Sequence, residues 1–337
     1  MVFMPIKVKD EIFKLEVKLP DLKIARLNSY LLLDEVPTLI DLGSNSYGAI
    51  ESLMEELNVL GFMFSEVKRI IITHYHIDHS GLLHLVNLIN PNAEIFISEA
   101  DFEIIKNMEE RYKELDYLFS INGAPSELIK KALSKEIEGR IRVFKKASGL
   151  KVNLIKGDEK VGKLNLVLTP GHTPGHVCVY SESKRVLFSG DHLLWDITPN
   201  VSYYNGNSDP LGDYIASLKK VKELKVDAVL PAHRGIYVEH EKRIEELIEH
   251  HKERLSEIVE MLRGRNLTAY EIARGVKWRS GSFDELDDFQ KRLALGETIS
   301  HIIYLERRGV LSRKTVSGII YYTLNEELGK RWNGELI

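Results

Sequence analysis

The chain has 337 residues, 44% of them hydrophobic, and a formal net charge of -4 at pH 7. This length allows a substantial core and predicts one large domain plus a smaller one. The single cysteine, Cys178, excludes an internal disulfide framework and is typical of a reducing cytoplasm. Because charged residues lie near the start, we expect no secretory signal there. No apolar stretch is long enough to span a membrane, and the net charge gives no general reason to expect nucleic acid as a partner. We therefore expect a cytoplasmic protein without a membrane partner.

The first hundred residues alternate between strand and helix patterns. Apolar alternation between Ile6 and Leu19 predicts edge strands that face a core on one side. Residues 28–33 and 38–42 are predicted to form a hairpin, and residues 46–60 an amphipathic helix. This order indicates an α/β protein whose helices lie outside its sheets.

Four potential metal ligands lie within six residues, directly after the apolar run 67–72: His74, His76, Asp78 and His79. The run predicts a buried strand, so these side chains lie on the loop at its carboxyl end. Imidazole and carboxylate together suit zinc and tolerate iron or manganese. Whether further ligands follow downstream decides between a metal site and the alternative of an exposed polar loop.

Three further loops have the same organisation. Residues 164–169 precede His172 and His176, residues 186–189 precede Asp191, and residues 228–230 precede His233. Each loop follows an apolar strand that ends at Gly or Pro. Together with the loop after residues 67–72, candidate ligands therefore follow the ends of four predicted strands. This recurrence favours one shared metal site.

The combined pattern resembles the metallo-β-lactamase-fold hydrolase superfamily, whose motifs are a His-x-His-x-Asp-His box, a distant His, an Asp and a last His. The resemblance covers roughly the first 240 residues and implies an α/β fold built as a four-layer αββα sandwich. It also implies two divalent metal ions, with zinc expected and iron or manganese as alternatives. The first ion would be held by His74, His76 and His172 and the second by Asp78, His79 and His233, with Asp191 as the bridge.

The same resemblance implies further roles. Asp41, which ends the apolar run 38–40, and His176 are expected to support the ligands through hydrogen bonds. Asp78 is expected to act in catalysis by orienting a metal-bound hydroxide or accepting its proton. Branches that run redox chemistry with a flavin partner place a glutamate where His76 stands, which disfavours a single-iron redox enzyme.

Residues 98–150 form a charged helical insert that the compact core of the superfamily does not need. We expect either a lid or pocket wall over the metals or a peripheral packing element. Tyr112, Tyr117 and Phe119 are pocket candidates only if the insert folds back over the site.

The aromatic loop 195–207 follows Asp191 and should border the site. Three of its residues are therefore candidates for the substrate pocket: Trp195, Tyr203 and Tyr204. Either tyrosine is a candidate to polarise a carbonyl, although ordinary packing explains both equally well.

The C-terminal part is predicted to be a separate unit, with residues 1–245 as the catalytic domain and 246–337 as the tail. A long helix is expected at 239–264, with His240, His250 and His251 on its solvated face. A capping box at Thr268 opens a short helix, and a second helix and a hairpin follow. This arrangement resembles the winged-helix tail of one branch of the superfamily.

The charge of the tail bears on its partner. Residues 251–337 contain 15 Lys and Arg and 13 Asp and Glu, a net charge of +2 (15 - 13). A phosphate-binding face normally shows a clear basic excess. We therefore expect a tail that packs on the core or forms a homodimer, and we do not favour nucleic acid as its partner.

Two metal ions that share a hydroxide predict a hydrolase. The resemblance extends to the glyoxalase II, acyl-thioester and lactonase branches, so the expected substrate is a small-molecule ester, thioester or lactone. The tailed branch also includes a single-strand endoribonuclease, so a phosphodiesterase or endoribonuclease on the same site is the alternative. A metal-dependent DNA-binding regulator is a third, less favoured reading.

Overall fold

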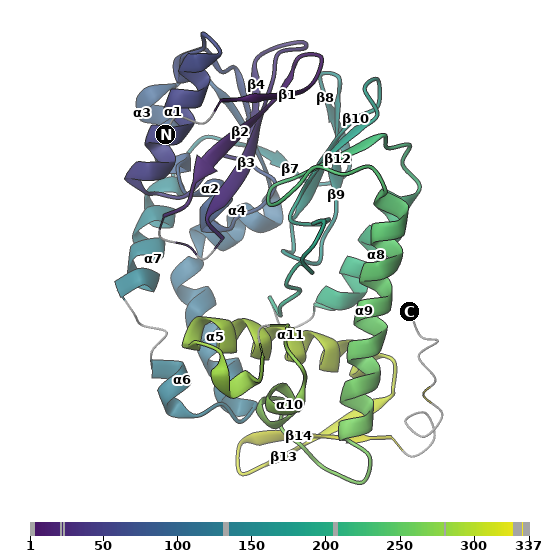
Figure 1. The fold of residues 1–337 in the computed structure, drawn as a ribbon. Helices are drawn as coiled ribbons and strands as arrows, with labels where there is room; N and C mark the ends of the chain where they lie inside the picture. The colour runs from purple at the N-terminus through teal and green to yellow at the C-terminus, as the bar shows by residue number, and fades with distance from the viewer. Residues whose placement is uncertain are drawn as a thin grey trace.

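The structure is a computed structural model that describes residues 4–20, 22, 24–130, 135–204, 208–279, 281–325 and 332. Within these residues two mixed sheets stack face to face, and helices cover both outer faces (Figure 1). A small two-stranded sheet lies at the opposite end of the molecule from the two large sheets.

The first sheet has its strands in chain order and changes from antiparallel to parallel pairing at β4. The predicted hairpin is confirmed, because β3 and β4 pair antiparallel. Of the predicted edge strands, β1 lies at the edge, but β2 is internal because it pairs with both β1 and β3. The strands are β1 (Ile6–Lys9), β2 (Ile12–Lys18), β3 (Arg26–Leu32), β4 (Thr38–Ile40), β5 (Arg69–Ile71), β6 (Glu94–Ser98) and β7 (Asn153–Ile155).

The second sheet has the order β12-β11-β10-β9-β8. Its neighbours pair antiparallel except β11 and β12, which are parallel and are connected through helix α8 (Pro210–Lys222). The strands are β8 (Glu159–Val161), β9 (Leu164–Leu168), β10 (Val177–Ser181), β11 (Val186–Gly190) and β12 (Ala228–Pro231).

Three hydrophobic clusters define four layers. One cluster lies between the sheets and joins residues such as Tyr30 of β3 with Phe188 of β11, whose rings meet edge to face. A second covers the outer face of the first sheet with α1 (Tyr47–Val59), α3 (Leu83–Ile89), α4 (Glu99–Lys106) and α7 (Lys135–Ala147). The third covers the second sheet with α8 and α9 (His240–Met261). The protein therefore has the αββα order that the sequence predicts.

The helical insert connects the sandwich to the C-terminal part. Its helices α4 and α7 pack with the first sheet, whereas α5 (Met108–Ile121) and α6 (Ser126–Lys130) contact α11 (Asp288–Arg307). Arg292 of α11 pairs with Asp116 of α5 at 2.7 Å, and its guanidinium lies over the Phe119 ring. Tyr117 is 68% exposed and Phe119 is buried in the third cluster, so neither is placed as a pocket residue.

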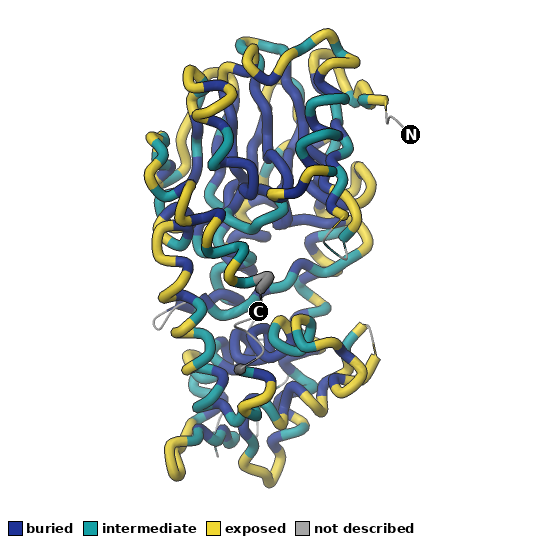
Figure 2. Tube along the Cα trace, turned by 90° about the vertical axis from the view of Figure 1, so that its left-hand side faces the viewer, coloured by how far each residue is buried: buried dark blue, intermediate teal, exposed yellow. Residues whose placement is uncertain are grey.

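The C-terminal part comprises α10 (Ala269–Gly275), η3 (Phe283–Glu285), α11, β13 (Leu311–Val316) and β14 (Ile319–Leu324). The capping box at Thr268 is confirmed, and so is the hairpin. The predicted boundary after residue 245 falls inside α9. Leu255, Leu295 and Tyr322 belong to the same cluster as Leu218 of α8, so this part shares its core with the sandwich. Figure 2 shows buried residues in both regions.

The prediction of a solvated face is wrong for His240 and His251 of α9. His251 is fully buried and His240 is 5% exposed, while His250 is partly exposed. The face of α9 that carries His251 is covered by α8 and α11, and Nδ1 of His251 lies 3.0 Å from Nε2 of His301. None of the helices in the described part of the chain combines the length and the apolar character that crossing a bilayer requires.

Candidate metal centre

The four ligand loops predicted from the sequence meet at one place. They follow β5, β9, β11 and β12, and the first continues into the short helix α2 (Ile77–Ser80). Within each of three overlapping groups, the ligand atoms lie within 4.8 Å of one another. The groups are His74, His76 and His172; His74, His79 and Asp191; and Asp78, His79 and His233.

The first cluster consists of three imidazole nitrogens. Nδ1 of His76 lies 2.9 Å from Nε2 of His74 and 3.0 Å from Nε2 of His172. Tetrahedral zinc with Zn–N bonds of about 2.0–2.1 Å holds such nitrogens roughly 3.3 Å apart, close to the spacing seen here. His74 is buried, whereas His76 and His172 are partly exposed, so the cluster has an open side.

The second cluster combines a carboxylate with two imidazoles. Oδ2 of Asp78 lies 3.3 Å from Nε2 of His233 and 3.8 Å from Nε2 of His79. Asp191 lies between the clusters, because its Oδ2 is 3.6 Å from Nε2 of His172 and its Oδ1 is 3.5 Å from Nε2 of His233. The geometry therefore offers three ligands to each of two cations, with Asp191 within reach of both.

Three buried atoms of this arrangement have no hydrogen-bond partner among the described residues: Nε2 of His79, Nε2 of His233 and Oδ1 of Asp191. Buried polar atoms are normally paired, and an unpaired one costs roughly 1–3 kcal/mol. A divalent cation between these atoms would satisfy all of them. The residues present thus fit a metal centre.

Hydrogen bonds at the far side of each ring fix its orientation. Nδ1 of His79 donates to Oδ2 of Asp41 at 2.8 Å. Nδ1 of His233 donates to the Arg26 carbonyl at 2.8 Å, and Nδ1 of His172 donates to the Asn200 carbonyl at 2.7 Å. Each of these bonds keeps the proton on Nδ1 and leaves Nε2 free to bind a cation. The rings are thereby set in the tautomer that a metal needs.

Asp41, the predicted support, holds the start of the first ligand loop. Its carboxylate accepts hydrogen bonds from the Thr73 amide at 2.8 Å and the Thr73 hydroxyl at 2.7 Å. Its backbone has φ of 58°, a conformation that side chains other than glycine rarely adopt. Strain of this kind is kept where the surrounding contacts over-determine it, as they do here.

His176, the other predicted support, acts through the backbone of Asp191. The Asp191 amide donates to Nε2 of His176 at 3.2 Å, and Nδ1 of His176 donates to the Thr169 hydroxyl at 2.8 Å. A Cβ on Gly190 would lie 2.6 Å from the same Nε2. The glycine therefore allows His176 to approach the chain just before Asp191.

The two clusters differ in electrostatics. Burial and the neighbouring His172 lower the pKa of His76 to about 3, so this ring is neutral. Burial also acts to lower the pKa of His79, but the carboxylates of Asp41, Asp191 and Asp78 together raise it above its usual range. Metal binding at the second cluster would therefore release a proton.

Sequence reasoning missed Asp101, which holds two ligand loops together. Its carboxylate accepts hydrogen bonds from the Tyr75 amide (2.9 Å), the Thr173 hydroxyl (2.8 Å) and the Gly175 amide (2.7 Å). Burial raises its pKa to about 7, although these three donors act to lower it. In the sequence it looks like an ordinary acidic residue in the first turn of a helix capped by Ser98.

Sequence reasoning also missed a link to the C-terminal part. Oε2 of Glu297 in α11 accepts a hydrogen bond from the Asn200 side chain at 2.7 Å, and the Gly296 carbonyl accepts one from the Tyr203 amide at 3.2 Å. A Cβ on Gly296 would lie 2.0 Å from the Ser202 hydroxyl. The loop that orients His172 therefore rests directly on α11.

The three candidate pocket aromatics have different surroundings in the structure. Trp195 is 41% exposed and stacks on Tyr237 with ring centroids 5.1 Å apart. The Tyr204 hydroxyl donates to Asp213 at 2.8 Å, so it is engaged away from the ligands. Tyr203 is partly exposed, and its carbonyl accepts a hydrogen bond from Arg111 at 2.6 Å. Residues 205–207 of the predicted loop lie outside the described residues.

Two solved structures share this architecture over nearly the whole chain. The metallo-beta-lactamase family protein TTHA1429 from Thermus thermophilus superposes with a TM-score of 0.80 at 27% identity, covering 95% of this chain and all of that one. A beta-lactamase domain protein from Burkholderia ambifaria superposes with a TM-score of 0.76 at 23% identity, covering 95% of each chain.

Comparison of the sequence with known proteins leads to the same family as comparison of the structures. The probable metallo-hydrolase YqjP of Bacillus subtilis is 23% identical over 312 residues, which cover 87% of this chain and 92% of that protein. The family model described as "Metallo-beta-lactamase superfamily" matches residues 26–233, which contain all seven residues of the metal centre. Since this match covers more than half of the chain and carries the residues that converge in space, the protein belongs to the metallo-beta-lactamase superfamily.

Proposed function

We propose that this hydrolase binds two divalent metal ions and uses them to cleave an ester, thioester or lactone of a small molecule. Asp191 supports this proposal most directly, because its Oδ2 lies 3.6 Å from Nε2 of His172 in the first cluster and 3.7 Å from Nε2 of His79 in the second. The three buried atoms without a partner belong to the second cluster and to Asp191, and the three imidazole nitrogens of the first cluster offer a separate position for the other cation. Zinc suits the nitrogen-rich set of ligands, and iron or manganese are the alternatives.

When bound, two such ions would lower the pKa of a bound water toward neutrality and would polarise the bond being broken. Within the chain, Asp191 sets the spacing of the clusters, and His176 and Asp41 hold the ligands in place. Burial acts to raise the pKa of Asp78, but His79 and His233 hold it below its usual range. Asp78 is therefore an ionised acceptor, and we assign it the orientation of the attacking water.

We propose a supporting role for the C-terminal part, residues 246–337, which we interpret as a winged-helix-like unit. Two arginines near its hairpin are already paired, Arg308 with Asp209 at 2.9 Å and Arg313 with Glu306 at 3.1 Å. These pairs reduce the positive charge available to phosphates, which disfavours nucleic acid as the partner. We also propose that the protein forms a homodimer and is located in the cytoplasm.

The test combines metal analysis with a substrate panel of thioesters, lactones, aryl phosphodiesters and single-stranded RNA. We expect two metal ions per chain and turnover of at least one acyl substrate. Asp191→Ala should lose turnover and at least one ion. Full turnover in that variant would contradict the bridge, and cleavage of RNA without acyl turnover would replace the proposed reaction with phosphodiester hydrolysis.

A further inference from the structure

Arg111 of α5 is a buried cation that pairs with no carboxylate of the described residues. The residue is 8% exposed, and its Nη2 donates to the Tyr203 carbonyl at 2.6 Å. Its Nε and Nη1 are buried and have no hydrogen-bond partner, and no ion pair among the described residues includes it. By contrast, Arg292 and Arg308, which reach the same region of the fold, each pair with an aspartate.

An unpaired buried charge is costly, because the low-dielectric interior does not replace the water that the charge has lost. The carbonyl of Tyr203 and its ring, 5.9 Å from the guanidinium carbon, offset only part of this cost. Buried charges are normally paired or bound to a ligand. The counter-ion of Arg111 is therefore expected to come from outside the chain.

The location of Arg111 connects it to the metal centre. Tyr203 belongs to the loop that follows Asp191, and Tyr75 stands between the ligands His74 and His76. Asn200 of the same loop as Tyr203 accepts a hydrogen bond from Nδ1 of the ligand His172 at 2.7 Å, so this loop joins Arg111 to the metal centre. Tyr75 and Tyr203 are both partly exposed.

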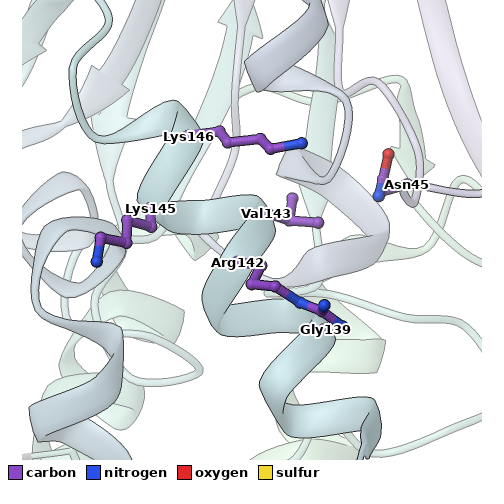
Figure 3. A pocket seen from close by; sticks show the side chains of 6 residues that line it. All are labelled: Asn45, Gly139, Arg142, Val143, Lys145 and Lys146. Carbon is purple, nitrogen blue, oxygen red and sulfur yellow. The ribbon is translucent and has the colours of Figure 1, made fainter.

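The same insert carries further cations that line a groove. This groove of about 480 Å³ lies between α7 and the loop after β4, and it is lined by Asn45, Gly139, Arg142, Val143, Lys145 and Lys146 (Figure 3). None of these residues is acidic, and no ion pair among the described residues includes the three cations of the groove. The side chain of Lys146 extends toward Asn45, whereas that of Lys145 points to the opposite side of α7 (Figure 3).

The groove is next to the ligand-bearing helix α2. A Cβ on Gly81, which follows α2, would lie 2.7 Å from the Asn45 amide nitrogen, so the two segments are in contact. Helix α7 also packs against α5. The insert therefore carries both the groove cations and Arg111, and Arg111 is the buried one of these four cations.

We propose that the substrate carries an oxyanion, a carboxylate or a phosphate, away from the bond that is cleaved, and that Arg111 is the residue that recognises it. The proposal rests on the proposed function and narrows it to anionic acyl compounds. Neutral acyl compounds would leave the guanidinium unpaired in the complex. Selectivity for the anion thus follows from the cost of that unpaired charge.

The experiment compares metal-loaded wild type, Arg111→Met and Arg111→Lys on matched thioesters: succinyl, butyryl and 3-phosphonopropionyl. The wild type should prefer an anionic acyl group over butyryl by at least tenfold in kcat/KM, mainly through KM. Arg111→Met should reduce this ratio to near one, mainly by raising KM for the anionic acyl groups, while Arg111→Lys should retain part of the preference. The succinyl and phosphonopropionyl arms distinguish carboxylate from phosphate.

Arg292→Met is the matched control. It also removes a guanidinium that connects α11 to α5, but this guanidinium is already paired with the carboxylate of Asp116. It should keep the preference for the anionic acyl group. A wild type without preference, or a preference that survives in Arg111→Met, would overturn the proposal.

Binding of the products separates this proposal from the proposed reaction. If metal-loaded protein turns over none of the thioesters, calorimetric titration with succinate and butyrate gives an independent answer. Both acids can bind metal through one carboxylate, but only succinate offers a second one to Arg111. Tighter binding of succinate that is lost in Arg111→Met would support the anion site even though the reaction failed, and equal binding of the two acids would refute it.

Discussion

The side-chain amide of Asn200 donates to Glu297 at 2.7 Å, while the carbonyl of the same residue accepts a hydrogen bond from Nδ1 of His172, also at 2.7 Å. A helix of the C-terminal part thus sets the orientation of a ligand in the metal centre. Glu297→Ala leaves the amide without its acceptor, and we expect metal affinity to fall by up to about tenfold. Glu297→Gln keeps an acceptor oxygen and should stay near wild type. Competition with a chromophoric chelator measures both variants, and equal affinities would show that the link is without effect.

Asp101 joins the two loops that carry His76 and His172 by accepting three hydrogen bonds. Asp101→Asn places an amide group against one of these donors, which should cost about 1–3 kcal/mol of unfolding free energy. Denaturant unfolding measures the loss. Glu103→Gln, on the exposed side of the same helix, is the control and should change little. A stability loss in the control as large as in Asp101→Asn would point to the helix and not to the loops.

Glu56 of α1 provides a test of pH dependence away from the metals. Burial raises its pKa from 4.5 to about 7, and one carboxylate oxygen has no partner among the described residues. The folded state therefore binds more protons than the unfolded state between about pH 4.5 and 7, so this group lowers stability as pH rises through that window. Glu56→Gln removes the effect. We expect the variant to gain about 1–3 kcal/mol relative to wild type between pH 5 and pH 8, and a gain that is independent of pH would contradict the assignment.

Gly171 shapes the loop that presents His172. Its φ is +142°, and a Cβ there would lie 2.5 Å from Cα of Tyr214. Gly171→Ala must therefore shift the loop backbone, and we expect weaker metal binding together with lower thermal stability. Gly157→Ala, where no described atom lies within 4 Å of the added Cβ, is the matched control. Metal analysis and thermal unfolding of the two variants distinguish a local effect on the loop from the general cost of adding a methyl group.

The family resemblance predicts the αββα layers and the assignment of the seven metal-centre residues, while local signals in the sequence place the ligand candidates at the ends of strands. Apolar strands end at loops, and loops at the carboxyl ends of strands share one edge of a fold. His74 and His233 could thus be placed together from the pattern of residues alone, although the chain between them is long. The ligand roles themselves remain a prediction that metal analysis will test.

Contacts that depend on how the helices pack could not be predicted from the sequence. Asp101, Arg111 and Glu297 each look like ordinary charged residues on helices, and only the fold shows that they are buried. The error on His251 has a different origin, because its spacing from Leu247 and Leu255 puts it on the apolar face of α9 and only its polarity suggested a solvated position. Helical periodicity identifies a face of a helix, but it does not say what lies against it.

The hydrophobic cluster that joins Leu218 of α8, Leu255 of α9, Leu295 of α11 and Tyr322 of β14 has a consequence for how the molecule comes apart. A fragment that stops at residue 245 would break α9 and leave apolar surface of the second sheet uncovered, so it should aggregate when expressed alone. Heating the intact chain should accordingly produce one cooperative melting step, with no stage at which the tail detaches from a still-folded sandwich.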